Sequence, residues 1–372
     1  MPVTVKGTFE IEFNDNINYS NANRSSDIIL RPGVVVGVNY QLTSINKVSL
    51  QLGVSYDQYI FHPNLSTYTN FAEVSPDSQL SLSMRLGRAT TVTVYDSFNY
   101  SLQPSDSLAV NPKTGQVITD IRAFGRFMNQ IGVKADWEAS GNTTLYGGVY
   151  RYDVFPQNAD YDFLRRWQYT GTAGIRQVLG SYTVNLDGSY TLNYYKTNLE
   201  NDSTSWYIAP TVTWVGENQL TLKATIGFSG YDFKTTGTNG DSSQPSTYVG
   251  EVSATFPLTS EIDNTITISR SSNFGYVSNT VQIDRVSYKI EHKEFLFKQM
   301  AGSLLLYYER GRDSGGTSPE RYDKFSVSPQ VDYAVSERLS LYASYEWTDK
   351  FSNFSARNYL RNRIILGLRY DF

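Results

Sequence analysis

The chain ends in LGLRYDF, residues 366–372, and this stretch decides how the rest of the sequence is interpreted. Apolar side chains occupy every second position up to the last one: Ile364, Leu366, Leu368, Tyr370 and Phe372. Charged residues, among them Arg363, Arg369 and Asp371, stand between them. Such alternation predicts a β-strand with one apolar face and one charged face. Because the ends of soluble domains usually fray into polar tails, we expect a neighbouring strand to hold this one to its last residue.

The composition excludes several classes of protein. The 372 residues include no cysteine, which excludes disulfides and thiolate metal sites. The net charge of -4 and the lack of a basic run give no reason to expect nucleic acid as a partner. No apolar stretch reaches 18 residues, so no transmembrane helix is predicted, and the first ten residues, MPVTVKGTFE, lack the apolar core of a signal peptide. If the protein is exported, we expect this sequence to be the mature chain.

Period-2 segments follow one another along the whole chain, and helical spacing of apolar residues is almost absent. Many of these segments are longer than the usual strand of about 5–6 residues. We expect 18 strands, at residues 3–19, 28–42, 46–60, 77–87, 89–102, 120–138, 142–155, 165–178, 181–195, 204–215, 218–233, 246–257, 261–273, 280–293, 295–311, 321–335, 337–350 and 357–372.

The connections between these strands alternate between short and long. Short turns are expected at, for example, 139–142, 179–180, 216–218 and 293–295, and the longest loops at 61–76 and 103–119. Short turns at one rim and long loops at the other are typical of bacterial outer-membrane barrels. The sequence therefore predicts an all-β fold: a closed antiparallel up-and-down transmembrane β-barrel of about 18 strands, with short periplasmic turns and long extracellular loops. Residues 1–372 would form a single domain in the outer membrane of a Gram-negative bacterium.

The tryptophans favour the membrane barrel over the alternative, a soluble propeller or sandwich. All five share the parity of the apolar face and lie toward strand ends: Trp137, Trp167, Trp206, Trp214 and Trp347. From Trp206 to Trp214, about 3.4 Å per residue gives roughly 27 Å along the strand. A tilt of about 40° reduces this to about 21 Å along the membrane normal, close to the apolar band of roughly 25 Å. These side chains are therefore expected to form the aromatic girdles of the barrel.

The last strand also carries a resemblance to known proteins. Gly367, Tyr370 and Phe372 resemble the C-terminal assembly signal of outer-membrane β-barrels, which implies the barrel-assembly machinery as a partner. Ile365 departs from that pattern, which usually has a polar residue two places before the glycine. The strand number, the tyrosine-rich strands and the loop rhythm resemble a family of β-barrel porins associated with exopolysaccharide export.

The positions between the apolar ones predict a polar inner face. A barrel of 16–18 strands leaves an aqueous channel, so we expect a water-filled pore. The alternative for any single charge is an ion pair that braces the wall. The residues expected to line the pore are Arg85, Gln130, Lys134, Arg166, Arg176, Lys223, Glu251, Lys289, Glu309, Asp332, Arg338, Glu346, Arg363 and Arg369.

Catalytic, metal and cofactor sites find little support in the sequence. The only two histidines, His62 and His292, should lie at opposite rims, so they cannot share a metal ion or a triad. Glu10 and Glu12 stand two apart on one strand face and could form a carboxylate pair, but alternating lumen-facing acids explain them equally well. We expect no enzymatic activity and no cofactor.

Three functions remain open. The first is a porin-like channel for hydrophilic solutes, including saccharides or an exported polysaccharide, because tyrosine rings stack on sugars. The second is a non-conducting anchor in a secretion or surface machine, with a periplasmic or surface protein partner. The third is a receptor or adhesin that uses the long loops. The lipid bilayer and lipopolysaccharide are expected partners in every case. If the barrel conducts, loops 61–76 and 103–119 should fold inward and narrow the lumen.

Overall fold

The structure, a computed structural model, is a single closed β-barrel. It describes residues 3–66, 73–74, 78–101, 109–110, 117–118, 125–157, 162, 165–196, 201–234, 244–274, 279–315 and 319–372. Within these residues the main sheet has 20 strands, two of which, β4 and β5, are two-residue additions. The other 18 form the wall, and each pairs antiparallel with its neighbours. The predicted fold class is therefore confirmed.

The wall strands are mostly 12 to 15 residues long. The first nine are β1 (Val3–Asn14), β2 (Asp27–Gln41), β3 (Lys47–Ser55), β6 (Gln79–Leu86), β7 (Thr90–Ser101), β10 (Arg126–Ser140), β11 (Thr143–Pro156), β12 (Arg166–Leu179) and β13 (Tyr182–Tyr195). The other nine are β14 (Ser203–Val215), β15 (Thr221–Phe233), β16 (Ser246–Thr259), β17 (Ile262–Phe274), β18 (Thr280–His292), β19 (Met300–Ser314), β20 (Arg321–Ala334), β21 (Leu339–Ser352) and β22 (Tyr359–Asp371). Short additions are β4 (Gln58–Tyr59) and β5 (Glu73–Val74).

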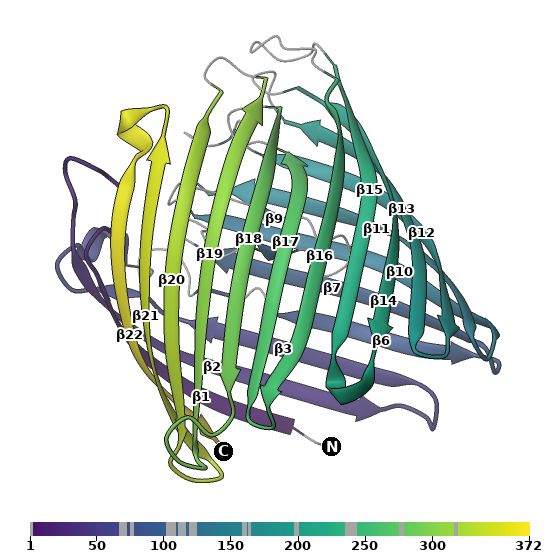
Figure 1. The fold of residues 1–372 in the computed structure, drawn as a ribbon, viewed down its shortest axis with the longest axis horizontal. Coiled ribbons are helices and arrows are strands. Elements are labelled where there is room, and N and C mark those ends of the chain that lie inside the picture. Colours follow the sequence, from purple (N-terminus) through teal and green to yellow (C-terminus); the bar gives the residue numbers. More distant parts are fainter. Residues whose placement is uncertain are drawn as a thin grey trace.

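The barrel closes through its first and last strands. β22 pairs with β1 from Lys6 opposite Asp371 to Asn14 opposite Arg363. The backbone N–H of Phe372 donates to the carbonyl of Val5 at 3.0 Å. Both ends of the chain lie at the rim of the short turns (Figure 1). The last residue is therefore held by a neighbouring strand, as the alternation in the C-terminal stretch predicted.

Side chains of alternate residues face lipid or lumen. On β22 the exposed apolar side chains are Ile364 and Leu366, and on β1 they are Ile11 and Phe13. These residues are register partners, Phe13 with Ile364 and Ile11 with Leu366. Their direct chain neighbours, such as Glu12 and Arg363, lie on the opposite face. We call this second face the inner face of the barrel.

Three predicted boundaries are wrong. β1 ends at Asn14 rather than at residue 19, because the side chain of Asn16 binds the backbone carbonyls of Ser20 and Leu360 and draws the chain out of the ladder. The turn expected at 293–295 extends to residue 299. There, the backbone N–H of Phe295 donates to the carbonyl of Met300, and the N–H of Met300 donates to the carbonyl of Phe297. β19 therefore begins only at Met300. β3 ends at Ser55, and the remainder of its predicted span includes only β4.

The described part of the chain contains no helix long and apolar enough to cross a membrane. Besides strands it has only three-residue 3-10 turns, such as Pro63–Leu65. A separate two-stranded sheet, β8 (Ala109–Val110) and β9 (Val117–Ile118), belongs to the connection between β7 and β10. The predicted loop positions Tyr68, Thr114 and Gly240 lie outside the described residues, whereas Gly315 follows the end of β19.

Candidate solute pathway through the barrel

The inner face carries most of the predicted pore-lining residues on strands. Thirteen of the fourteen lie within wall strands, on the face opposite the exposed apolar side chains, as Lys134 does next to the exposed Val133. Arg338 lies instead in the turn before β21, at the short-turn rim. The structure joins six of the predicted residues in three ion pairs: Lys223 with Glu251 at 2.9 Å, Arg369 with Asp332 at 3.6 Å, and Arg363 with Glu346 at 3.7 Å.

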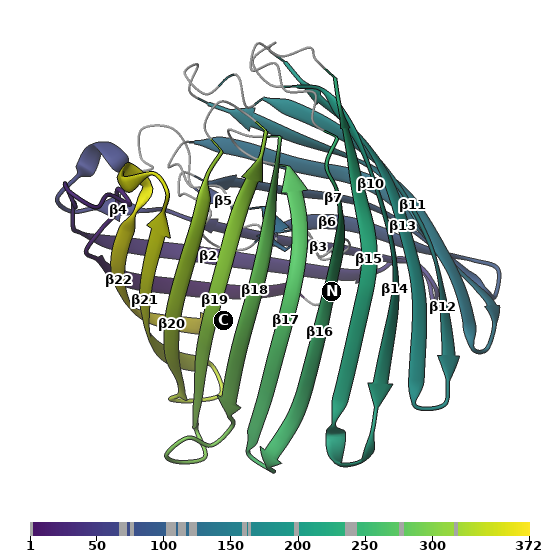
Figure 2. The ribbon, with the colours of Figure 1, turned by 45° about the horizontal axis from the view of Figure 1, so that its top comes forward.

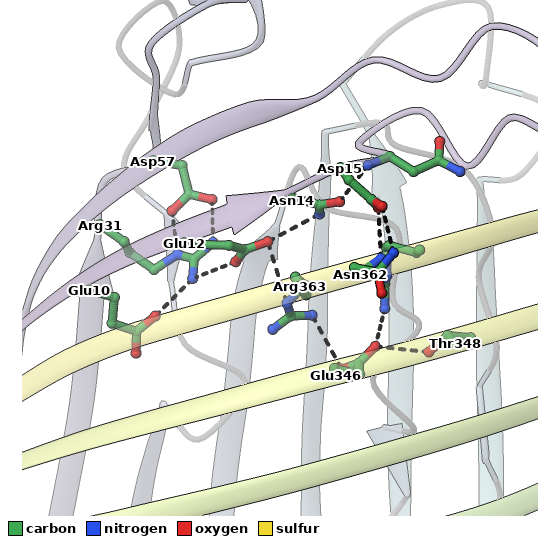
Figure 3. Close-up of polar contacts among 12 residues, drawn as sticks. Glu10, Glu12, Asn14, Asp15, Arg31, Asp57, Glu346, Thr348, Asn362 and Arg363 are labelled. Atoms are coloured by element: carbon green, nitrogen blue, oxygen red, sulfur yellow. Dashed lines mark hydrogen bonds and ion pairs between the residues drawn. The ribbon is translucent and has the colours of Figure 1, made fainter.

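A buried ion-pair cluster spans the seam where the barrel closes (Figure 3). Arg31 on β2 lies at its centre. Its Nε is 2.6 Å from Asp57 Oδ1, and its Nη1 is 2.8 Å from Glu10 Oε2 and 3.5 Å from Glu12 Oε2. Asp57 and Glu12 are almost fully buried. The guanidinium of Arg31 on β2 therefore holds two carboxylates of β1 and one of the segment after β3. These contacts link the first three strands of the wall.

The cluster continues across the seam onto β22 and β21. Arg363 Nε lies 3.4 Å from Glu12 Oε1, so the first and last strands share an ion pair as well as backbone hydrogen bonds. Glu346 then receives both Arg363 and the buried Arg361. On the outer face of the same strands, Asp15 accepts hydrogen bonds from the backbone and side chain of Asn362.

A second buried cluster lies further along the same wall. Glu309 on β19 is 0% exposed and pairs with Arg285 on β18 and with Lys324 Nζ on β20 at 3.3 Å. The hydroxyl of Tyr322 donates to Glu309 Oε1 at 2.8 Å. Cross-strand pairing places Lys324 opposite Lys350 of β21, and Lys350 Nζ is 2.9 Å from Glu320 Oε1.

The carboxylate of Glu320, just before β20, is also bound by Arg357 at 3.1 Å. Burial by itself would raise the pKa of this carboxyl group. The ammonium of Lys350 and the guanidinium of Arg357 outweigh burial, and the pKa of Glu320 lies below its ordinary value of 4.5. Together the two clusters form a belt of alternating charges on the inner face from β18 through β22 and β1 to β3, which we call the charged belt.

The wall opposite the charged belt is more open. In the closed strand order β10–β13 face β19–β22 across the lumen. Lys134 and Arg176 on this wall are exposed, and neither makes an ion pair with another described residue. Arg176 lies over the ring of Tyr146 at 5.6 Å, and the hydroxyl of Tyr146 donates to Asp187. This side of the lumen therefore presents charged and aromatic groups to water.

The connection between β7 and β10 reaches the far side of the barrel. β9 contacts β17, although six strands, β11 to β16, lie between β10 and β17 along the wall. In Figure 1 β9 lies within the outline of the barrel, and Figure 2 shows the same barrel turned with its top forward. A segment that starts at one wall and contacts the opposite one must cross the lumen. This position agrees with the expected inward course of loop 103–119.

Several residues of the charged belt were absent from the predicted set. These are Arg31, Arg285, Lys350 and Arg361. Strand parity could have placed each of them on the inner face, since each alternates with apolar positions. The sequence gives no signal for their partners. Arg31, for example, binds Asp57, 26 positions later in the chain, and Glu10, 21 positions earlier.

The histidines are far apart, as expected. His62 Nδ1 is 2.8 Å from Asp27 Oδ2 in the connection after β4, whereas His292 ends β18 and its ring meets Phe295. No group of three metal-binding side chains occurs among the described residues. Glu10 and Glu12 both bind Arg31, which accounts for their spacing as structural acids.

The five tryptophans lie on the outer face at two levels. Trp167, Trp206 and Trp347 lie toward the long-loop rim, and Trp137 and Trp214 toward the short-turn rim. Trp167 stacks on Tyr194, and Trp214 packs near Tyr182. Trp347 is five residues from the end of β21, because that strand continues to Ser352. At the end of β22, the rings of Tyr370 and Phe372 pack edge to face, and Gly367 leaves room for the ring of Tyr342.

Comparison with known proteins yields relatives by fold only. No protein-family model matches the chain, and no curated protein is a significant match. Among solved structures it resembles OccK2 (OpdF) of Pseudomonas aeruginosa in complex with glucuronate, with a TM-score of 0.59, 10% identity and coverage of 100% of this chain and 98% of that one. It also resembles a BenF-like porin from Pseudomonas fluorescens Pf-5, with a TM-score of 0.58, 13% identity and coverage of 100% of this chain and 99% of that one. OccAB4 of Acinetobacter baumannii has a TM-score of 0.55 and 11% identity, and the match covers 100% of this chain and 99% of that one.

These neighbours agree in architecture along the whole chain. The fold is that of solved outer-membrane porins of Gram-negative bacteria. Sequence identities near 10% establish a similarity of fold only. None of the comparisons supports a link to exopolysaccharide export.

Proposed function

We propose that the barrel is a channel for small hydrophilic solutes across the outer membrane. The observation that carries this proposal is the unequal lumen. A buried charged belt braces one wall, while the opposite wall has the half-buried ring of Tyr146 and two exposed cations, Lys134 and Arg176, that form no ion pair with a described residue. A barrel built only as an anchor has no need of an exposed charged surface inside. Barrels of about 16–18 strands are wide enough to hold an aqueous channel.

The solutes to test first are small saccharides and sugar acids. The open wall offers the ring faces of Tyr146 and Tyr207 beside Lys134, Arg176 and Asp187, and such groups can stack on sugar rings and bond their hydroxyls. The neighbour OccK2 was crystallised with glucuronate, a sugar acid. Because the wall carries both signs of charge, size and hydrogen bonding should sort solutes more strongly than charge.

The β8–β9 segment is the proposed constriction. Its contact with β17 supports a course across the lumen, and a solute would then pass beside it. Removing this obstacle should widen the pathway without touching a wall strand.

Planar-bilayer conductance and liposome swelling test the proposal together. The wild-type barrel should give stable, small single-channel steps and admit monosaccharides. Replacing residues 109–118 by a short glycine-serine link should raise the conductance and admit larger sugars. A wild-type barrel that is folded but silent would reject the channel and favour the second candidate, an anchor or surface receptor with a protein partner.

A further inference from the structure

Two arginines lie opposite each other on the outer face near the long-loop rim. Arg312 of β19 and Arg321 of β20 are direct cross-strand partners. Partner side chains of this kind start about 4.5–5.5 Å apart, and like charges in such positions destabilise a sheet. Both side chains are exposed. We call these two residues the arginine pair.

The carboxylates near the arginine pair are already engaged. Asp323 is 2.8 Å from Arg310 Nε and also accepts a hydrogen bond from Tyr308, and Asp284 binds Arg270. Neither Arg312 nor Arg321 has an ion-pair partner within the described part of the chain. The intervening loop residues 316–318 are Gly, Thr and Ser, which contribute no acid. Asp323 attracts Arg312 only at longer range and is ion-paired with Arg310, so no described carboxylate forms an ion pair with either member of the arginine pair.

The depth of the pair in the membrane indicates which anion is available. Tyr308 and Phe325, the outer-face partners four residues below, have ring centroids 4.8 Å apart, and Phe325 is exposed to lipid. Four residues at about 3.3 Å with a tilt of about 40° place Arg312 roughly 10 Å above those rings. Long arginine side chains can reach back toward the edge of the apolar band. The guanidinium groups thus lie at the level of lipid headgroups.

We propose that the arginine pair binds a phosphate group of a phosphorylated glycolipid in the outer leaflet. Guanidinium groups present paired donors that fit phosphate oxygens. A phosphate between Arg312 and Arg321 would turn the like-charge repulsion into two attractive contacts, while acyl chains lie against Phe325 and Phe351 below. The proposal rests on the outer-membrane location with the long-loop rim outward, and it does not depend on solute transport.

The test compares wild type with the double variant Arg312→Gln and Arg321→Gln. Binding of diphosphoryl lipid A to detergent-solubilised barrels would be measured by native mass spectrometry, with EDTA present to remove bridging cations. The double variant should bind about tenfold more weakly or worse, the loss expected from at least one charge-assisted hydrogen bond. Dephosphorylated lipid A should bind wild type and variant equally.

A matched control is Arg151→Gln. Arg151 also lies on the outer face, on β11, but is paired with Asp153 at 2.9 Å, so its loss should leave lipid A binding unchanged. A thermal-stability readout keeps the test valid if the variant folds poorly. Without lipid the double variant should be at least as stable as wild type, because repulsion is removed, and lipid A should stabilise wild type more.

Three outcomes would overturn the proposal. They are equal lipid A affinity in wild type and double variant, equal affinity for phosphorylated and dephosphorylated lipid, and a changed oligomeric mass in the variant, which would make the pair a protein contact. Single-channel conductance should be the same in both proteins, since the pair lies outside the lumen. A barrel that never conducts would therefore reject the proposed channel and leave this inference standing.

Discussion

Glu309 provides the sharpest test of how the charged belt holds the wall. Its carboxylate is 0% exposed, lies 3.3 Å from Lys324 Nζ, pairs with Arg285 and accepts a hydrogen bond from Tyr322 at 2.8 Å. The substitution Glu309→Gln keeps the shape of the side chain but removes its charge. Arg285 on β18 and Lys324 on β20 would then flank position 309 of β19 without the carboxylate that now pairs with both.

The expected cost follows from the burial of the partners. Lys324 is 2% exposed, so its ammonium cannot turn to bulk water when the carboxylate is lost. Removing one partner of a buried ion pair costs about 3–5 kcal/mol of folding free energy. The matched control is Glu251→Gln, whose partner Lys223 is 2.9 Å away, with side chains 39% and 44% exposed. A pair so accessible to water should contribute no more than about 1 kcal/mol.

The assay is urea-induced unfolding in lipid vesicles, followed by the fluorescence of the five tryptophans. A second variant, Glu309→Gln with Lys324→Met, removes one of the two stranded cations and should recover about 1 kcal/mol or more relative to Glu309→Gln alone. If Glu309→Gln proved no more harmful than Glu251→Gln, the belt would be hydrated rather than buried, and the reasoning would be refuted. No recovery in the double variant would assign the loss to packing instead of charge.

Three further predictions concern the membrane face, acid stability and topology. On β21, Ala343→Arg points to lipid and should cost about 2–4 kcal/mol, whereas Ser344→Arg points to the lumen and should cost under about 1 kcal/mol in the same unfolding assay; equal costs would disprove the parity. Because the pKa of Glu320 lies below its ordinary value of 4.5, its contribution to stability should be present above pH 4.5 and lost as the pH falls through the folded pKa. Replacing it with Gln should flatten that part of a stability–pH curve. Single cysteines in intact cells should be labelled at Gly315 and protected at Ser140, and the reverse pattern would invert the barrel.

The local sequence determined the strands and the two faces of the wall. Alternation with a period of two fixes which side chains share a face, and this requires no knowledge of a partner strand. The same pattern in the last strand, ending on Phe372, predicted a closed sheet, and its pairing with β1 confirmed this. Boundaries were wrong where local hydrogen bonds compete with the ladder, through the side chain of Asn16 after β1 and through the backbone of Phe295 and Met300 before β19. Such local bonds leave no trace in the alternation.

Only the tertiary structure decided which charges meet. Parity placed Glu12 and Arg363 on the inner face, but their ion pair joins residues at opposite ends of the chain and depends on closure and register. The arginine pair likewise depends on the register that the β19–β20 connection sets, because a slip of one residue would turn one of the two into the lumen. The inward course of β9 to β17 also depends on the closed barrel, which brings distant walls within reach of one loop. Alternation is a property of each strand alone, whereas register and closure arise only when all strands are assembled.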